Sequence, residues 1–545
     1  MTDPLAPRMR WWGWGVDGQD APLPKAALAL LGSELRANGA PAAPPVLERI
    51  ALSEPALTAR ARAKLVAAVG AEHVRDDRLT RVAHAAGRSY ADLVRLRSGR
   101  GVTLPDAVVY PAGHGEVAAL LNVCAAESIA VVPFGGGTSV VGGVEPLRGR
   151  FASVVSLDLA RISGLVALDR CSQLASFHGG TTGPEVERLL DEHGFTLGHL
   201  PQSFEFSTVG GWAATRSAGQ ASTGYGRIDE LVVALRAATP SGELSTLAVP
   251  ASAAGPPLRE LLLGSEGVLG VITEVTLRVR PRAAAQRWDA WSLPCFGAGA
   301  GALRELEQGG AVPDVARLSD EEETRISLAL ASHPAATRAL RAYMRIRGHD
   351  AGCLAILGFD GSGAQIARRR ARARSNLRRH GAIALGPAPG AAWARARFRG
   401  AYVRDELIGR GVLVETLETA TTWTRLQVLH RDVGAALRGA LARRGTPAVV
   451  MCHVSHLYPT GASLYFTFLA RQQAGAELEQ WRAAKAAASD AIAAAGATIT
   501  HHHAVGTDHA PWLGGEVGRL GIEALRAVKA RVDPAGIMNP GKLLP

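Results

Sequence analysis

Residues 132–140 read Val-Pro-Phe-Gly-Gly-Gly-Thr-Ser-Val, and they continue the apolar residues Ala130 to Val132, which predict a short β-strand. Three consecutive glycines leave the backbone N–H groups of this loop uncovered and allow positive φ angles, so the loop can surround a pyrophosphate. The loop matches neither the G-x-G-x-x-G pattern nor the phosphate-binding pattern that ends in Lys-Ser/Thr. A triple glycine alone is also typical of a flexible turn, so the rest of the chain has to decide between these alternatives.

Two later segments favour a binding site. Residues 201–212 read Pro-Gln-Ser-Phe-Glu-Phe-Ser-Thr-Val-Gly-Gly-Trp, and their small hydroxyl residues and paired glycines suit a groove lined by backbone. Residues 263–273 read Leu-Gly-Ser-Glu-Gly-Val-Leu-Gly-Val-Ile-Thr and lead from a glycine turn into a strand. In this order along the chain, the three segments resemble the FAD-binding domain that vanillyl-alcohol oxidase, D-lactate dehydrogenase and alkyldihydroxyacetonephosphate synthase share.

The resemblance implies that the chain binds FAD, with the pyrophosphate in the glycine loop and the flavin and adenosine parts along the other two segments. Some relatives attach FAD covalently through a histidine in or beside the loop. Here Thr138 stands at that place and His114 lies a strand and a helix away, so we expect non-covalent FAD. The residues expected to contact FAD are Pro133, Gly135, Gly136, Gly137, Thr138, Ser139, Val140, Gln202, Ser203, Ser207, Thr208, Gly210, Gly211, Glu266, Gly267, Gly270, Val271 and Ile272.

The pattern of apolar segments predicts an α+β protein, and a chain of 545 residues requires more than one domain. Residues 1–100 are punctuated by prolines and predict a helical accessory region. Residues 101–282 alternate strands with helices, which together with the resemblance predicts a PCMH-type FAD-binding domain of two subdomains. Residues 283–500 predict a substrate-binding cap, an antiparallel sheet covered by helices, and residues 501–545 a C-terminal segment that packs near the flavin.

Residues 501–503 are three consecutive histidines in the interior of the chain. An isolated triplet is typical of a solvated turn or of a fortuitous metal site, but neighbouring positions of an extended chain point to opposite faces and do not converge on one ion. We therefore expect no metal. Hydroxy-acid dehydrogenases of this fold usually carry Glu-His-Gly in the comparable region, whereas alkyldihydroxyacetonephosphate synthases carry a histidine triplet followed by Val-Gly, as residues 501–506 do. The resemblance to the synthases extends to residues 10–15, 316–320, 402–405 and 463–468.

This closer resemblance implies a reaction and its residues. The synthases exchange the acyl group of acyl-dihydroxyacetone phosphate for a long-chain fatty alcohol, through an adduct at flavin N5 and without net redox change, and so form an ether lipid precursor. By this resemblance, Arg317 and Arg404 stand at the family's phosphate-binding positions. Arginine suits a phosphate because its guanidinium stays charged and donates parallel hydrogen bonds. Tyr465 matches a proton-transfer position, and His501, His502 and His503 assist that transfer and polarise the carbonyl oxygen.

Two alternatives stay open from the sequence alone. An FAD-dependent dehydrogenase or oxidase of 2-hydroxy acids, such as D-lactate or glycolate, shares the whole fold. A non-catalytic binder of lipid surfaces or nucleic acid would use the formal net charge of +11. Nothing resembles a nucleic-acid module, however, and the arginine-rich residues 367–374 are typical of a solvated helix face, so no nucleic-acid partner is expected.

The remaining features concern the setting of the protein. No apolar stretch reaches the ~18 residues that span a bilayer, and Asp3, Pro4 and Pro7 stand where a secretory signal has its apolar core. We expect a cytoplasmic protein. Five scattered cysteines predict buried thiols rather than disulfides. The family resemblance further implies a homodimer and peripheral contact with a membrane.

Overall fold

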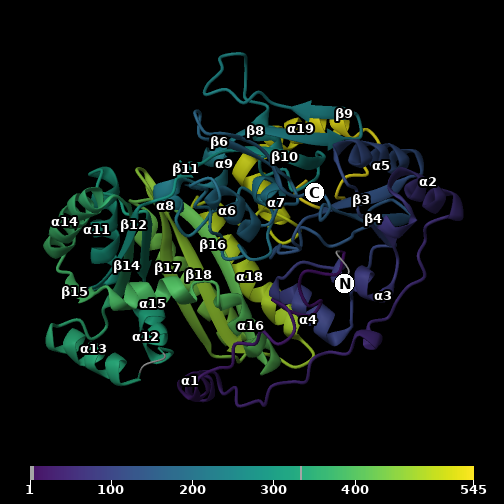
Figure 1. Cartoon of the computed structure of the whole chain (residues 1–545). Coiled ribbons are helices and arrows are strands. Elements are labelled where there is room, and N and C mark those ends of the chain that lie inside the picture. Colours follow the sequence, from purple (N-terminus) through teal and green to yellow (C-terminus); the bar gives the residue numbers. More distant parts are fainter. Residues whose placement is uncertain (1–4, 332–333, 545) are drawn as a thin grey trace.

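The computed structural model describes residues 5–331 and 334–544. An N-terminal helical region leads into a half with two main sheets, and a third, larger sheet covered by helices forms the other half (Figure 1). The mixed composition of helices and mostly antiparallel sheets confirms the α+β class. Within the described residues, no helix is both long enough and apolar enough to cross a membrane.

The N-terminal region connects the two halves. Its helices begin at polar caps: Thr58 and Asp77 each accept a backbone N–H of the first turn, and Ser89 forms a capping box with Asp92. The elements are α1 (Lys25–Leu35), η1 (Leu47–Arg49), α2 (Ala59–Val69), η2 (Ala71–His73), α3 (Arg78–Ala83) and α4 (Tyr90–Ser98). Helix α2 packs on the first half, whereas α1 and α4 contact strands of the large sheet.

The first half contains a four-stranded sheet of order β1-β2-β4-β3 and a five-stranded antiparallel sheet of order β5-β6-β10-β8-β9. Strands β2, β3 and β4 are parallel and almost wholly buried, as their continuous apolar sequences require. Helix α5 contacts β3 of one sheet and β8 of the other.

The bounds of these elements are β1 (Val74–Arg75), β2 (Ala107–Val109), α5 (His114–Ala126), β3 (Ile129–Phe134), β4 (Ser153–Asp158), β5 (Leu165–Asp169), β6 (Leu174–His178), α6 (Gly183–Asp191), β7 (Phe195–Thr196), α7 (Val209–Thr215), α8 (Ser222–Tyr225), α9 (Ile228–Leu231), β8 (Val232–Thr239), β9 (Gly242–Ser245), α10 (Arg259–Leu262), β10 (Val271–Arg278) and β11 (Arg280–Pro281). Strands β7 and β11 pair as a small two-stranded sheet.

The second half is built on a seven-stranded antiparallel sheet of order β15-β12-β14-β13-β17-β18-β16. Side chains alternate between its faces. In β17, Cys452 and Val454 belong to the core that the helices share, whereas His453 and Ser455 point to the other face, where they line a cavity. Helices α11, α14 and α17 pack on the core face.

The elements of this half are β12 (Ala285–Leu293), α11 (Phe296–Gln308), β13 (Val315–Ser319), α12 (Glu321–Ala329), α13 (Pro334–Ile346), β14 (Cys353–Gly361), α14 (Gly363–Arg379), β15 (Ile383–Gly386), α15 (Ala388–Ala396), α16 (Gly400–Gly409), β16 (Val412–Thr422), α17 (Leu426–Arg443), β17 (Ala448–Tyr458), β18 (Gly461–Arg471) and α18 (Glu477–Ala494).

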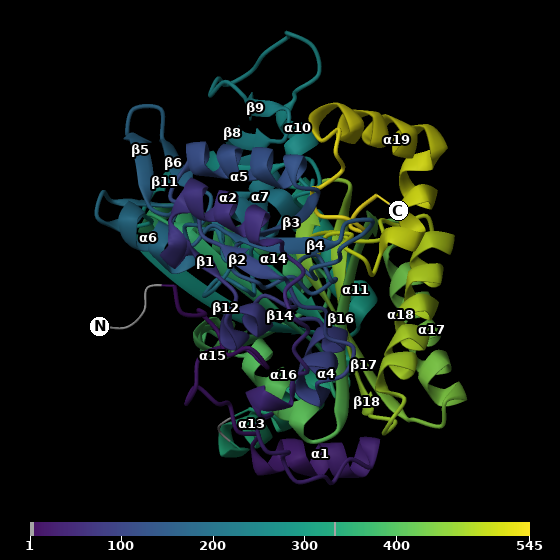
Figure 2. The same ribbon diagram turned by 90° about the vertical axis from the view of Figure 1, so that its right-hand side faces the viewer.

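After α18 the chain returns to the first half. Helix α19 (Ala510–Val532) runs alongside the five-stranded sheet (Figures 1 and 2). Beyond α19, residues 537–539 pair with β3: Val131 donates its N–H to Ile537, and Asn539 donates its N–H back to Val131, both at 2.8 Å. The histidine triplet lies on the crossing between the halves.

The cysteines differ in part from the expectation. Cys124, Cys353 and Cys452 are buried, but Cys171 and Cys295 are exposed, so the expectation of buried thiols is wrong for these two. Cys171 lies in the turn between β5 and β6 and Cys295 precedes α11, places where the chain runs over the surface. All five are free thiols.

Candidate active site

A cavity of about 470 Å³ lies between the first half and the cavity-facing side of the large sheet. Every residue that the sequence predicts to contact FAD lines it, from the glycine loop, from residues 202–211 and from residues 266–272. The wall formed by the second half includes Arg317, Arg404 and Tyr465, and the C-terminal crossing adds His502 and His503. Segments from three distant parts of the chain thus enclose one site.

The glycine loop is shaped by close packing as well as by its exposed backbone. A Cβ atom on Gly136 would lie 2.0 Å from the carbonyl oxygen of Phe206, and one on Gly135 would lie 2.3 Å from Oγ1 of Thr208. Gly137 has a φ of +65°, in the left-handed region. Glycine is therefore required for the loop to approach the second segment, and the bare backbone that results fits the pyrophosphate of a dinucleotide such as FAD.

Glu266 joins the third segment to the C-terminal crossing. Its side chain is buried and accepts the backbone N–H groups of Val505 and Gly506 at 2.8 and 2.7 Å. Burial raises the pKa of this carboxyl to about 7, although the two N–H groups oppose the shift. Glu266 also adopts a φ of 51°, and Asn539 donates a side-chain N–H to its carbonyl oxygen at 2.7 Å.

Glu418 of β16 holds the same crossing from the other side. Its carboxylate is buried and accepts the backbone N–H groups of His501, His502 and His503 at 2.5, 3.0 and 2.7 Å. Burial acts to raise its pKa, but the histidine rings and the N–H donors outweigh burial and hold the pKa well below its usual range. Two buried glutamates, one from each half, thus fix the loop that carries the triplet.

The three histidines are not equivalent. His502 and His503 line the large cavity, whereas His501 lines a second cavity of about 380 Å³ beside it. Burial lowers the pKa of His502 to about 3 and also lowers the pKa values of His501 and His503. The rings are therefore neutral at ordinary pH and can act as hydrogen-bond donors or acceptors without carrying charge.

The two predicted phosphate-binding arginines have different surroundings. Arg317 donates to Glu323, and its guanidinium nitrogens lie 2.9 and 3.0 Å from the ring nitrogens of His453. Arg404 donates one N–H to the carbonyl oxygen of Arg88 at 2.5 Å, while its Nε and second terminal nitrogen are buried without a hydrogen-bond partner. Unpaired donors on a buried guanidinium need an acceptor, and a phosphate would supply one, so Arg404 is the better placed of the two.

Tyr465 of β18 lies between the arginines and the histidines. Its ring stacks on that of His453, with centroids 4.9 Å apart, and lies 5.6 Å from the ring of His503. Burial raises the pKa of its hydroxyl to about 12, while a hydrogen bond with Thr416 acts in the opposite direction. The hydroxyl is thus protonated at neutral pH and can hold a proton for transfer.

Sequence reasoning missed several residues of this site. Glu418, His453 and His456 were not singled out, although each stands in an apolar strand, where a buried charge or imidazole needs a partner. Glu323 was missed as well; burial acts to raise its pKa, but His453 and Arg317 lower it to about 2. For the three strand residues the available signal was a polar side chain inside an apolar strand, whereas Glu323 lies on helix α12 and gave no such signal.

Known proteins are similar to this chain over most of its length. The family described as "FAD binding domain" matches residues 105–248, and the family described as "FAD linked oxidases, C-terminal domain" matches residues 282–543. Alkyldihydroxyacetonephosphate synthase of Dictyostelium discoideum is 35% identical over 483 residues, which cover 87% of this chain and 79% of that protein. The synthase of Trypanosoma brucei brucei is 32% identical with the same coverage. A solved alkyldihydroxyacetonephosphate synthase structure superposes with a TM-score of 0.86 at 30% identity and covers 98% of both chains.

The fold, the cavity and the two domain matches define a flavoprotein of the FAD-linked oxidase type, with FAD as its cofactor. The similarity over most of the chain then identifies one family within this class. The chain belongs to the alkyldihydroxyacetonephosphate synthase family, which confirms the resemblance seen in its sequence.

Proposed function

We propose that the protein is an FAD-dependent alkyldihydroxyacetonephosphate synthase, which exchanges the acyl group of acyl-dihydroxyacetone phosphate for a fatty alcohol and so forms an ether bond. One observation carries this proposal: Arg404 has two buried, unpaired guanidinium nitrogens in the cavity that Tyr465 and His503 also line. A phosphate bound by Arg404 would satisfy these donors and bring the rest of the substrate toward proton-transfer groups.

FAD held by the glycine loop, residues 202–211 and residues 266–272 would supply an electrophilic centre for the exchange, which would need no external electron acceptor. The chain's own residues bind and orient the substrate and move protons. Arg404, with Arg317 beside it, binds the phosphate. A neutral imidazole nitrogen of the triplet accepts the proton from the carbon next to the ketone, and Tyr465, whose hydroxyl stays protonated, returns a proton to that carbon after the exchange. His502 and His503, as neutral donors, polarise the ketone oxygen.

The rival function is oxidation of a 2-hydroxy acid, which the same fold supports. A hydroxy acid offers one carboxylate, whereas the cavity wall carries two arginines together with Tyr465 and two histidines of the triplet. Full-length identity of 32–35% to synthases supports the exchange reaction over the rival.

The test incubates purified protein with palmitoyl-dihydroxyacetone phosphate and a labelled long-chain alcohol. We expect fatty acid and the labelled ether to form in equal amounts while the flavin ends oxidised. D-Lactate and glycolate, added without oxygen, should leave the flavin spectrum unchanged. Rapid anaerobic bleaching by either acid, with no ether formed, would assign the oxidation instead.

We also propose that the enzyme meets its lipid substrates at a membrane face, and α13 supports this finer point. Ile346 and Tyr343 of this helix are 81% and 38% exposed, and Arg338, Arg341 and Arg345 lie on the same helix, a combination that suits an anionic bilayer surface. Ile346→Asp should reduce sedimentation with vesicles that contain anionic phospholipid. Leu247→Asp, at a residue 79% exposed in the loop after β9, is the matched control, and equal loss in both variants would exclude α13.

Two further parts of the proposal come from the sequence, and the first of them rests on the family resemblance. We propose a homodimer, for which sedimentation velocity should give a mass near twice that of one chain. We propose a cytoplasmic location, which cell fractionation tests; recovery of the protein only from an extracytoplasmic fraction would contradict it.

A further inference from the structure

The second cavity lies directly behind the histidine triplet. His502, Ala504 and Glu266 line both cavities and so form the wall between them. The second cavity is lined in addition by His501, Tyr458 and Arg227. The proposed reaction gives no role to Tyr458 or Arg227, although both side chains are largely buried.

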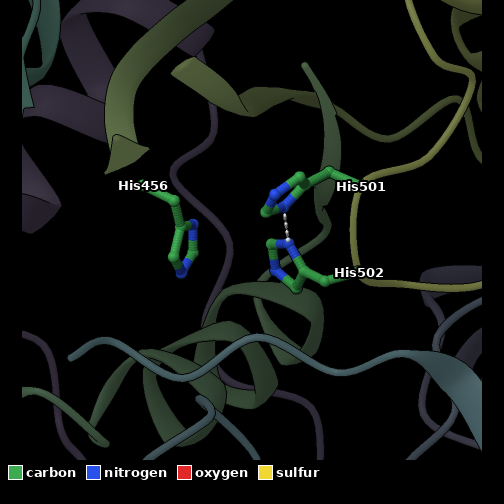
Figure 3. A group of neighbouring side chains, drawn as sticks. All are labelled: His456, His501 and His502. Carbon is green, nitrogen blue, oxygen red and sulfur yellow. Dashed lines mark hydrogen bonds between the residues drawn. The ribbon is translucent and has the colours of Figure 1, made fainter. Parts of the chain in front are cut away.

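A continuous chain of hydrogen bonds crosses this wall. Arg227 hydrogen-bonds to the hydroxyl of Tyr458, and that hydroxyl lies 2.5 Å from Nε2 of His501. Nδ1 of His501 lies 2.9 Å from Nδ1 of His502, and Figure 3 shows the two rings meeting through these nitrogens. His502 lines the large cavity, so the chain of bonds runs from Arg227 to this cavity.

The donor and the acceptor of each hydrogen bond can be assigned one after another, starting from Arg227. A guanidinium only donates, so the oxygen of Tyr458 accepts from Arg227, and the Tyr458 proton is directed at Nε2 of His501. Neutral His501 then carries its own proton on Nδ1, which it donates to Nδ1 of His502. Neutral His502 is left with its proton on Nε2.

The same histidines could instead hold a metal ion. Ligand atoms of His456, His501 and His502 lie within 4.8 Å of one another (Figure 3). Both nitrogens of His456 are already hydrogen-bonded, however, Nε2 to the carbonyl oxygen of Gly219 at 2.9 Å and Nδ1 to the hydroxyls of Ser455 and Ser463 at 2.9 and 3.1 Å. The nitrogens of His501 are likewise engaged, so a metal would have to replace existing bonds.

We propose that Tyr458 is a positioning residue of the exchange reaction: through His501 it holds His502 in the tautomer that points Nε2–H at the ketone oxygen of the substrate. This rests on the proposed function. Negative charge develops on the ketone oxygen when the neighbouring carbon loses its proton, and an oriented N–H donor in a cavity shielded from water stabilises that charge. Without the Tyr458 hydroxyl, His501 and His502 can each take either tautomer, and a lone pair of His502 would then face the oxygen.

The kinetic test uses Tyr458→Phe, which removes only the hydroxyl. We expect the flavin content and the KM for palmitoyl-dihydroxyacetone phosphate to stay within twofold of the wild type, while kcat falls at least ~10-fold, because a wrong tautomer disables a donor without changing its position. Exchange of the hydrogen next to the ketone with deuterated water should fall by the same factor. Tyr225→Phe, which removes a hydroxyl that bonds Asp360 outside both cavities, is the control and should match the wild type.

A wild-type kcat in Tyr458→Phe, or a loss of flavin together with kcat, would overturn the assignment. The tautomer itself is read independently of activity, by ¹⁵N NMR of FAD-loaded protein labelled at histidine, with the His502 signals identified from a His502→Gln sample. Protonated Nε2 in the wild type and a mixture in Tyr458→Phe support the proposal, and protonated Nδ1 on wild-type His502 overturns it. Absence of ether formation by the wild type contradicts the proposed function but leaves this spectroscopic test decisive.

Discussion

Arg317 and Arg404 show how the partners of a side chain decide its use. Both match the family's phosphate-binding positions, and both line the cavity. Glu323 and His453 already occupy Arg317, whereas Arg404 keeps buried donors that nothing in the described protein satisfies. Arg317 therefore also stabilises the fold, because its removal would leave the buried Glu323 carboxylate with a weaker partner.

For Arg404→Ala we expect a higher KM for acyl-dihydroxyacetone phosphate, by roughly 10- to 100-fold, since a hydrogen bond to a charged group contributes about 1.5–3 kcal/mol. Flavin content should stay at the wild-type level. Steady-state kinetics and the absorbance ratio of flavin to protein measure both. Arg431→Ala, at an exposed arginine of α17, is the control, and loss of flavin from Arg404→Ala would show that this arginine serves the cofactor.

Tyr465→Phe should keep the fold and the flavin but lower kcat by ~100-fold, the usual scale of acid–base catalysis. The raised pKa, about 12, means that the wild-type hydroxyl keeps its proton throughout the working range, so only its removal is informative. The matched control is Tyr225→Phe, which removes a hydroxyl that bonds Asp360. Turnover near the wild-type rate in Tyr465→Phe would show that the Tyr465 hydroxyl takes no part in proton transfer.

At the scale of elements, the glycine loop and the crossing at residues 501–506 depend on contacts with other segments. The glycine loop after β3 lies directly against residues 206–208, and this contact is possible only because the loop glycines have no side chain. The crossing has no regular hydrogen bonds of its own at the triplet, and Glu418 and Glu266 satisfy its N–H groups instead. Each element is therefore formed jointly with a partner distant in sequence.

Gly136→Ala tests the loop. The added methyl would meet the carbonyl oxygen of Phe206, and overpacking of this kind costs about 1–3 kcal/mol, so we expect a large loss of bound FAD and a lower melting temperature. Gly115→Ala is the control, because a Cβ atom at this position of α5 meets no atom within 4 Å and alanine favours a helix. Full FAD occupancy in Gly136→Ala would show that the loop can move aside.

At the scale of the whole molecule, the C-terminal segment binds the two halves together. It leaves the large sheet after α18, passes the cavity with the triplet, and ends by pairing with β3 (Figure 2). The cavity is thus enclosed by both halves and by this segment, and binding of FAD should stabilise the entire fold.

Denaturation of the protein, which opens this enclosure, should release the FAD from the chain. Thr138 occupies the loop position where covalent relatives have a histidine, and His114 hydrogen-bonds Thr273 at 2.8 Å and is absent from the cavity lining. We expect acid precipitation of the yellow protein to leave all flavin in the supernatant. Flavin that remains with the pelleted chain would contradict non-covalent binding.

The buried histidines predict how stability depends on pH. Burial lowers the pKa values of His199, His456 and His509 to about 3 from an ordinary 6.5. As pH falls below 6.5 the unfolded chain takes up protons that the folded protein refuses, so stability that is complete above pH 6.5 is lost progressively toward pH 3. At pH 5, each of the three histidines lowers the free energy of unfolding by on the order of 1–2 kcal/mol relative to its value above pH 6.5.

The melting temperature should therefore fall steadily between pH 6.5 and 4. His509→Asn, which keeps a donor for the carbonyl oxygen of Ala504, should make this fall shallower. A melting temperature independent of pH down to 4 would show that these rings are already accessible to protons.

Helices and strands were largely predictable because their patterns are local. The strand expected at Ala130 to Val132 lies within β3, the strand expected after the glycine turn of residues 263–273 is β10, and the helix face expected at residues 367–374 lies within α14. The three FAD segments were recognisable for the same reason, since glycines and small hydroxyl residues at fixed spacing reveal a backbone-lined groove without any knowledge of its partners. The tyrosine, the arginines and the triplet came from resemblance, and the domain boundaries and individual site roles stay predictions.

The sequence by itself determined the fold class, the FAD-binding segments and the family, because periodicity and short motifs are written in neighbouring residues. Only the tertiary structure decided which arginine keeps free donors, which histidines face the cavity, and which side chains hold them. Glu418 is 83 positions from His501, and the two meet because β16 runs beside the crossing. Such contacts depend on the packing of whole sheets, so the hydrogen bonds that set the direction and protonation of the triplet exist only in the folded chain.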